Sequence, residues 1–247
     1  MRALLKLTWV ECKLFFREPI GAFFTLLFPL MLLFLFGSIY GNAPTPLLGG
    51  QGTIDVSVPA YTAMIIATTG LLSLSISVAS YRERGILRRL RVTPVRPHAI
   101  LVAQAVVLFL MTTLGMALLI VAGRFVYGLR FQGQALSVAG GFVLSCLSFF
   151  ALGFVLAGLL PTARTAQIVV MVFFYPMIFL SGAGLPRELM PQTVQRVAEF
   201  LPLTYVVNLL RGLWVGESWA THSRDVLVLA GMLGVCAVVS TLTFRWE

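Results

Sequence analysis

Residues 20–40 read IGAFFTLLFPLMLLFLFGSIY and contain no charged side chain. A helix of about 20 apolar residues crosses the ~30 Å hydrocarbon core of a lipid bilayer. Comparable apolar runs follow at residues 59–80, 99–123, 136–160, 165–184 and 226–243. The sequence therefore predicts an all-α, polytopic membrane protein with six transmembrane helices in a single domain, residues 1–247.

The composition supports this fold class and limits the partners. Of the 247 residues, 59% are hydrophobic and only 11% are charged, too few for the surface of a soluble domain. The net charge of +9 fits the excess of Lys and Arg that membrane proteins carry on their cytoplasmic side, so no nucleic acid is expected as a partner. The three cysteines are scattered and indicate neither a disulfide framework nor a metal site.

The distribution of cations predicts the orientation of the chain. Twelve of the 18 Lys and Arg residues lie before the first span, in 81–98, between the fourth and fifth spans, or after the sixth. Because positive loops stay in the cytoplasm, both termini are expected there, with membrane lipids as surroundings. The expected location is the cell membrane, plasma or inner.

Residues 1–19 are predicted to form a helix in the membrane interface. On a helical wheel its cations share one narrow face and its apolar residues a neighbouring stripe. Glu11 and Glu18, seven residues apart, form a second polar line that lipid contact alone does not explain. A merely solvated first helix is the alternative. The cations are Arg2, Lys6, Lys13 and Arg17, and the stripe is Leu5, Trp9, Cys12 and Phe16.

Residues 185–225 are too long for a turn and too interrupted to cross a bilayer. Pro186, Pro191 and Pro202 divide the segment. Pro191 can open one short helix, and Thr204 can cap a second. We expect two short helices that enter the outer leaflet and return, with the three prolines forming an external gate.

Several kinds of chemistry are missing from the sequence. No carboxylate is expected within the six spans, which argues against ion-coupled transport. A phosphate-binding GxxxxGK[ST] loop needs a lysine after glycine, and the only lysines are Lys6 and Lys13. We therefore expect no catalytic residue, no metal and no cofactor bound by this chain.

Two spans carry candidate residues for a substrate pathway. Thr62, Thr69, Ser73 and Ser80 fall on one side of the second span, and Phe174 and Ile178 share a face of the fifth. The hydroxyl stripe either lines a polar pathway or holds helices together. The apolar face either meets substrate or packs in the core. The pathway hypothesis assigns Thr69, Ser73, Phe174 and Ile178 to substrate contact.

Residues 81–97, YRERGILRRLRVTPVRP, concentrate charge in a single loop. We predict a short helix over 82–91 with an apolar ridge and a basic rim. Such a ridge suits a plug that docks into a cleft of a soluble protein. The alternative is a basic loop that sets topology and contacts anionic lipid. The ridge is Glu83, Ile86, Leu87 and Leu90, and the rim is Arg84, Arg88 and Arg91.

This loop resembles the cytoplasmic loop of ABC-2-type permeases, the membrane subunits of type V, ABCG-like exporters. FFREP at 15–19 resembles the end of the family's connecting helix, and LSGAGLPRELMP at 180–191 resembles its external region. The chain departs from the family pattern at Ile86, where Thr is common. The matching loop residues are Glu83, Arg84, Gly85, Leu87, Leu90, Thr93 and Pro94.

The resemblance implies a permease subunit of an exporter that moves an amphipathic drug, lipid or glycolipid out of the cytoplasm or inner leaflet. It implies two separate ATPase subunits, which bind ATP and Mg and dock on the 82–91 coupling helix. It also implies a second permease chain, identical or related, approached by the first span, with Pro29, and by the fifth. A non-transporting assembly factor or a passive channel is the alternative.

Overall fold

A computed structural model describes residues 2–86 and 98–243. All regular structure in these two ranges is helical, and six helical segments are long and apolar enough to cross a membrane. This confirms the predicted fold class. The six segments are Phe23–Tyr40, Pro46–Glu83, Ala99–Tyr127, Ala135–Leu159, Ala163–Leu180 and Ser223–Leu242.

The elements follow one another along the chain with short connections. The amphipathic segment forms α1 (Arg2–Arg17). The first span consists of α2 (Pro19–Ala22), a π-helical stretch (Phe23–Leu27) and α3 (Phe28–Tyr40). The second consists of α4 (Thr53–Ala67), a π-helical stretch (Thr68–Ser73) and α5 (Leu74–Glu83). The others are α7 (His98–Tyr127), α8 (Ala135–Leu159), α9 (Ala163–Leu180), α10 (Gln192–Ala198), α11 (Pro202–Trp214) and α12 (Ser223–Thr243).

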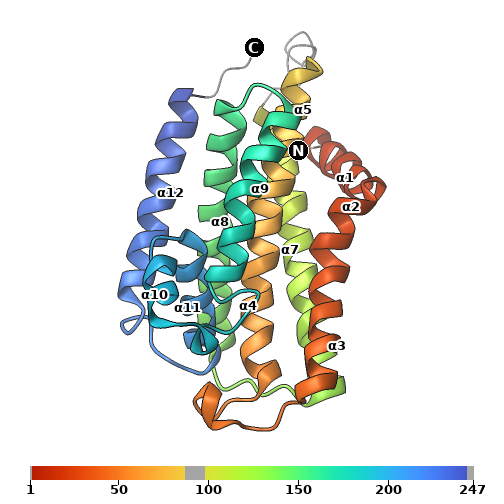
Figure 1. The fold of residues 1–247 in the computed structure, drawn as a ribbon. Coiled ribbons are helices and arrows are strands. Elements are labelled where there is room, and N and C mark those ends of the chain that lie inside the picture. Colours follow the sequence, from red (N-terminus) through yellow and green to blue (C-terminus); the bar gives the residue numbers. More distant parts are fainter. Residues whose placement is uncertain (1, 87–97, 244–247) are drawn as a thin grey trace.

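The second span forms the centre of the bundle. In its most apolar stretch of 18 residues, 78% of the residues are buried. In the sixth span, which packs mainly on α8 and α11, the corresponding share is 17%. α4 and its continuation contact α3, α7, α8, α9 and α11 (Figure 1). Small residues permit this crowding: a Cβ on Gly153 of α8 would collide with the carbonyl oxygen of Gly70.

The described residues begin and end at the same end of the bundle. In Figure 1, α1, the end of α5 and the end of α12 are at the top, and the α3–α4 connection lies at the bottom. α10 and α11 lie toward the bottom as well. We call the top the inner end and the bottom the outer end, in keeping with the orientation expected from the sequence.

Some predicted boundaries are wrong. The α-helix of the second span, α4, begins at Thr53 rather than at residue 59, and Pro59 lies within it. The expectation that no carboxylate lies within the spans fails in their terminal turns, which contain Asp55, Glu83 and Asp225. Pro59 lacks a backbone N–H, so the helix loses one hydrogen bond there but continues through it.

The helix predicted over 82–91 does not start at Arg82. α5 continues from the membrane to Glu83, and Gly85, with φ +65°, then turns the chain in the left-handed region that favours glycine. Ile86 is half-buried. Leu87, Arg88, Leu90 and Arg91 lie outside the described residues.

The segment after α9 contains the two expected short helices, α10 and α11. Pro191 precedes α10 and Pro202 is the first residue of α11, while Pro186 precedes a 3-10 turn (Arg187–Leu189). Thr204 does not cap α11, because its hydroxyl instead donates to the carbonyl of Ala198 at 2.6 Å. α11 is mostly buried among α4, α8, α9 and α12, so it is part of the core.

Candidate functional site

At the inner end, Arg82 binds the end of a neighbouring span. Its Nη1 donates to the carbonyl oxygens of Ala157, Gly158 and Leu160 at 2.6, 3.1 and 3.4 Å. The last carbonyls of a helix have no partner within it and carry partial negative charge. A guanidinium is therefore well matched to the end of α8.

The next residue, Glu83, binds the start of the following span. Its Oε2 accepts a hydrogen bond from the N–H of Ala163, the first residue of α9, at 2.9 Å. The first N–H groups of a helix lack partners and carry partial positive charge, which a carboxylate satisfies. Thr162 adds a cap, since its hydroxyl accepts from the N–H of Thr165 at 3.1 Å.

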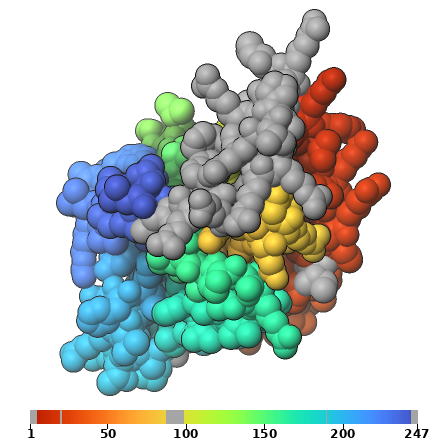
Figure 2. Space-filling view, turned by 90° about the horizontal axis from the view of Figure 1, so that it is seen from above, coloured from red at the N-terminus to blue at the C-terminus, as the bar shows by residue number. Residues whose placement is uncertain are grey.

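Together these contacts form what we call the loop junction, residues 82–83 with 157–163. Figure 2 looks onto the inner end, where the tip of α5 lies between the α8–α9 turn and α1. The basic loop follows directly after the junction. Arg82 and Glu83 therefore link this end of α5 to the end of α8 and to the start of α9 through charged hydrogen bonds.

Not every predicted coupling residue lies at the junction. Glu83 does, although it binds the N–H of Ala163 in this chain rather than a group of an ATPase. Arg84 is exposed and forms the turn after α5. Ile86 follows it, and Leu87, Arg88, Leu90 and Arg91 are outside the described residues.

The predicted pathway residues occupy different surroundings. The Thr69 hydroxyl is fully buried and lies 2.9 Å from the Thr112 hydroxyl of α7, which is the arrangement of helix packing. Phe174 and Ile178 are 6% and 8% exposed and belong to the hydrophobic core. Ser73 is half-buried and lines a small cavity of mixed polarity with α1 and α7.

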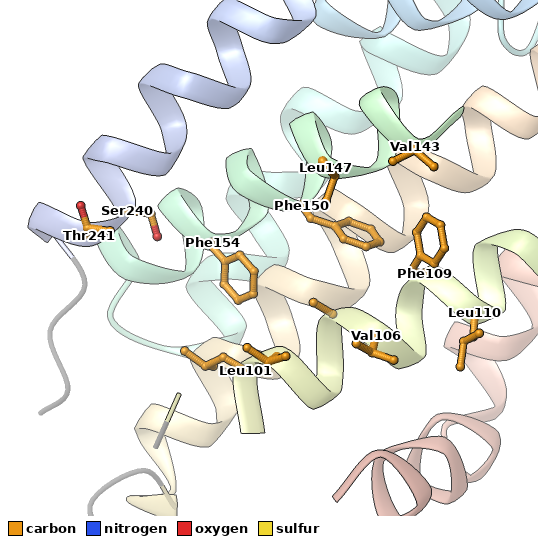
Figure 3. A pocket seen from close by; sticks show the side chains of 12 residues that line it. Leu101, Val106, Phe109, Leu110, Val143, Leu147, Phe150, Phe154, Ser240 and Thr241 are labelled. Atoms are coloured by element: carbon orange, nitrogen blue, oxygen red, sulfur yellow. The ribbon is translucent and has the colours of Figure 1, made fainter. Parts of the chain in front are cut away.

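A larger cavity of about 600 Å³ opens between α7, α8 and α12. Phe109 of α7 and Phe150 and Phe154 of α8 point into it, and Ser240 and Thr241 of α12 lie at one end (Figure 3). The cavity is apolar apart from those hydroxyls. No sequence pattern predicts this cavity, because it depends on the mutual placement of three spans.

A polar contact joins α1 to the second span. The Tyr81 hydroxyl lies 2.9 and 2.8 Å from the two carboxylate oxygens of Glu11, and Glu11 is only 6% exposed. Burial raises the pKa of Glu11, the Tyr81 hydrogen bond opposes that shift, and the nearby charge of Glu18 adds to it. This gives Glu11 a partner that interfacial lipid could not provide.

At the outer end, Asp55 organises two connections between spans. Its carboxylate accepts from the Asn42 amide at 3.0 Å, the Gly52 N–H at 3.2 Å and the Arg130 N–H at 2.8 Å. In return, the side-chain oxygen Oδ1 of Asn42 accepts from the N–H groups of Ile54 and Asp55, at the start of α4. The sequence did not mark Asn42.

The segment with the predicted gate prolines is also held by charged groups. Arg211 of α11 pairs with Glu188 at 2.7 Å, and Arg187 donates to the side-chain oxygen of Asn208 at 3.1 Å. Burial acts to raise the pKa of Glu188, but the Arg211 contact outweighs it and holds that pKa below its usual range. Among the described residues, no cluster of three or more His, Cys, Asp or Glu is suited to a metal ion.

Comparison with known families identifies the chain. The family described as "ABC-2 type transporter" matches residues 2–214. The chain belongs to this family of transporter membrane domains. The match includes α1, the loop junction and α11, whereas Ser240 and Thr241 of α12, which line the larger cavity, lie beyond it.

Named relatives agree with this family. The chain is 29% identical to the "Probable multidrug ABC transporter permease YbhR" of Escherichia coli K12 over 161 residues, 65% of this chain and 44% of that protein. It is 27% identical to the "Putative transport permease ycf38" of Cyanophora paradoxa over 223 residues, 89% of this chain and 76% of that protein. The chain thus aligns with less than half the length of the Escherichia coli relative. The chain described here is a multi-pass membrane permease subunit of the ABC-2 family.

Proposed function

We propose that this permease subunit moves an amphipathic drug, lipid or glycolipid-type molecule out of the cytoplasm or inner leaflet. A separate ATPase subunit, which binds ATP and Mg, supplies the energy through residues 81–98. The chain resides in the plasma or inner membrane, with both termini in the cytoplasm. The printed name of one relative, a probable multidrug permease, supports this substrate class.

The observation that carries the proposal is the loop junction. Arg82 and Glu83 connect the start of the basic loop to the end of α8 and the start of α9. An ATPase that binds the loop and moves it would displace two spans at once. In this proposal, Arg84, Ile86, Leu87, Arg88, Leu90 and Arg91 meet the ATPase, while Glu83 also keeps its cap on α9.

The proposed dimer explains an exposed apolar surface on α9 and α3. In the single chain, Val172 and Phe179 of α9 are 65% and 62% exposed, and Met31 of α3 is 55% exposed. These two helices flank the central second span, as the partner-facing first and fifth spans of the proposal require. A second permease chain, identical or related, would cover these helices. Together the two chains would complete the pathway lined by Ser73. The segment with Pro186, Pro191 and Pro202 would gate this pathway from outside.

The cavity between α7, α8 and α12 supports an amphipathic cargo. Its wall suits an apolar chain, and the hydroxyls of Ser240 and Thr241 suit a polar group at one end. It opens on a face separate from α9, so it would serve as a first binding place for a molecule arriving from the membrane. Thr69, Phe174 and Ile178 would meet substrate only after the helices around them move.

Two substitutions at Glu83 test how energy enters. Glu83→Gln removes the charge but retains an oxygen that can accept from the Ala163 N–H, whereas Glu83→Ala removes both. The measurement is substrate-stimulated ATP hydrolysis by the permease–ATPase complex in proteoliposomes. If Glu83 also meets a basic group of the ATPase, both variants reduce stimulation several-fold; if it only caps α9, Glu83→Gln retains it.

Co-purification of the chain with an ABC-type ATPase subunit distinguishes the proposal, which expects such a complex, from its alternatives. An assembly factor or a passive channel would not stimulate an ABC-type ATPase, and the two Glu83 variants would then behave like the unaltered chain. Native mass spectrometry of the active complex is expected to show two permease chains. A complex with one permease chain and full activity would contradict the dimer.

A further inference from the structure

The larger cavity, between α7, α8 and α12, occupies only one half of the height of the bundle. On α7 its lining runs from Leu101 to Leu110, nine residues or about 14 Å of helix at about 1.5 Å per residue. On α8 it runs from Val143 to Phe154, eleven residues or about 16 Å. Because α7 starts and α8 ends at the inner end, the cavity extends from near that end to about the middle of both helices. Its length is close to half of the ~30 Å hydrocarbon core, which is the thickness of one leaflet.

This cavity is a groove that opens sideways. Toward the outer end, the rings of Phe109 and Phe142 connect α7 with α8, with centroids 5.7 Å apart. Phe150 is 4% exposed and forms the floor. The rim is open, since Val106 of α7 and Leu147 of α8 are 40% and 46% exposed. The space, which we call the α7–α8 groove, therefore faces the lipid around a transmembrane bundle.

Polar side chains lie at one end of the α7–α8 groove. Among the described residues that line it, Ser240 and Thr241 alone have a polar side chain, and Figure 3 shows them at the end nearest Phe154. The Thr241 hydroxyl donates to the Val238 carbonyl at 2.8 Å, so its oxygen stays available as an acceptor. The groove thus matches a molecule with a polar group at the inner end and an apolar chain that points to the middle of the membrane.

An apolar groove within a bilayer is best filled by an apolar chain. Water is held only where polar groups surround it. An empty groove would forfeit the dispersion contacts of side chains such as Phe150 and Leu147. The acyl chains of lipids lie at the depth of the groove and have the direction of its long axis. One such chain would fill it from the polar end to the Phe109–Phe142 pair.

We infer that the α7–α8 groove binds one acyl chain of a phospholipid from the leaflet at the inner end, with the headgroup beside Ser240 and Thr241. This inference deepens the proposed function and rests on it for the role of the groove as a first binding place. It specifies the molecule held there as a lipid gripped by a single tail. Lipid binding is measured without the ATPase, so it holds or fails separately from transport.

The test is photolabelling of the purified full-length permease in nanodiscs of phosphatidylethanolamine and phosphatidylglycerol. The probe is a small fraction of phosphatidylethanolamine that carries a diazirine at the middle of one palmitoyl chain. Mass spectrometry of peptides locates the label. We expect the label to concentrate on residues 101–110 and 143–154, several-fold above the other lipid-facing surfaces.

Two substitutions and one matched control assign the label to the groove. Val106→Trp and, separately, Leu147→Trp place a large ring in the groove from opposite sides and should reduce the label there several-fold. Val121→Trp adds the same side chain to α7 outside the groove, at a position that is 52% exposed, and should label like the unaltered chain. Both groove positions are partly exposed, and using two of them keeps the test decisive if one variant folds poorly.

The length of the acyl chain provides a second measurement. Lysophosphatidylethanolamine with a palmitoyl chain should compete with the probe. The same headgroup with an octanoyl chain, which is too short to reach Phe109, should compete several-fold less at an equal concentration in the nanodisc. This comparison separates recognition of the chain from recognition of the headgroup.

Four outcomes would overturn the inference. Label spread evenly over the lipid-facing surfaces would make the groove an ordinary bilayer contact, and label retained in both groove variants would place the lipid elsewhere. Competition independent of chain length would mean that the groove does not hold the tail. Label that appears only after deletion of residues 244–247 would assign the groove to the end of the chain itself.

Substrate-stimulated ATP hydrolysis separates this inference from the proposed function. Absence of stimulation in the unaltered complex, with the label in place, would contradict the proposed function and leave the lipid site standing. Full stimulation in a chain that shows no preferred labelling of the groove would contradict the lipid site alone.

Discussion

Both ends of the bundle use charged side chains to bind groups of neighbouring segments, but the two ends differ in how completely they are closed by these contacts. At the outer end, Asp55 gathers three donors, and Arg211 and Glu188 tie down the segment before α11, which is itself buried. At the inner end, Arg82 and Glu83 cap two helices, but a cavity remains beside them and the basic loop continues beyond.

The difference indicates that the two ends of this bundle are built for different degrees of movement. The outer end is a network whose polar groups are satisfied within the chain, so it resists displacement. At the inner end, single side chains bind the helix termini, and under the proposed function a small movement of α5 would be transmitted through them. The predictions below test this contrast, from the largest expected effect to the smallest.

The largest effect on stability is expected for Asp55→Ala at the outer end. The change leaves the donors of Asn42, Gly52 and Arg130 without their acceptor in a buried position. We expect a loss of about 3 kcal/mol in the free energy of unfolding, measured by denaturation of the purified protein in detergent micelles. Asp55→Asn retains one acceptor oxygen and should lose less; equal stability of all three proteins would show that this network is not a fixed scaffold.

A smaller loss of stability is expected for Arg82→Ala at the inner end, with a larger loss of coupling. The freed carbonyls of α8 can be partly hydrated at the membrane surface, so we expect about 1–2 kcal/mol. Substrate-stimulated ATP hydrolysis should fall several-fold, because α5 no longer holds α8. Arg82→Lys retains a cation that can reach the carbonyls and should recover part of the coupling. Full coupling in Arg82→Ala would remove the junction from the mechanism.

Much of this contrast could not be predicted from the sequence. The six spans could, because an uncharged run of about 20 residues has few alternatives to a transmembrane helix. The partner of Glu83 could not, because Ala163 lies 80 residues away and offers only a backbone N–H, which every residue except proline has. The sequence pattern indicates that lipid contact alone does not explain Glu11, but only the fold, in which α1 packs on α7, brings Tyr81 of α5 to it.

The predicted helix over 82–91 shows a related limit. Its periodicity placed Glu83 with Ile86 on one face, but periodicity does not reveal where the preceding span stops. Gly85 ends α5 after Glu83, so Arg82 and Glu83 belong to the membrane helix and point to the α8–α9 turn. The hydroxyl stripe allows two interpretations, and no sequence pattern indicates that the Thr69 hydroxyl lies 2.9 Å from the Thr112 hydroxyl.

A pH effect is expected at the outer end, through Glu188. Its pKa is lower in the folded protein than the ordinary 4.5 of the unfolded chain. The stabilisation by Arg211 is therefore present above pH 4.5 and is lost as the pH falls through the lower, folded pKa. Unfolding temperatures measured from about pH 6.5 down to about pH 3.5 should show the unaltered chain approaching Glu188→Gln. A constant difference between the two at every pH would mean that the ion pair contributes nothing that depends on charge.

The smallest effect is expected for Arg84→Gln, at the start of the basic loop. Arg84 is exposed, so any pair that it forms at the rim of an ATPase cleft is screened by water and salt. We expect a change below about 1 kcal/mol in the apparent binding free energy between permease and ATPase, and no change in unfolding temperature.

The dependence of that small effect on salt shows whether Arg84 is exposed or enclosed in the complex with the ATPase. Titrating the ATPase onto the permease in nanodiscs at about 50 mM and about 500 mM salt should show the loss only at the lower concentration, because the screening length shortens from about 14 to about 4 Å. Arg196→Gln, which removes a cation near the outer end, is the matched control and should bind the ATPase unchanged at both. If the loss for Arg84→Gln persists at high salt, the arginine is enclosed by the ATPase, and the inner end would then be as tightly held in the complex as the outer end is in the single chain.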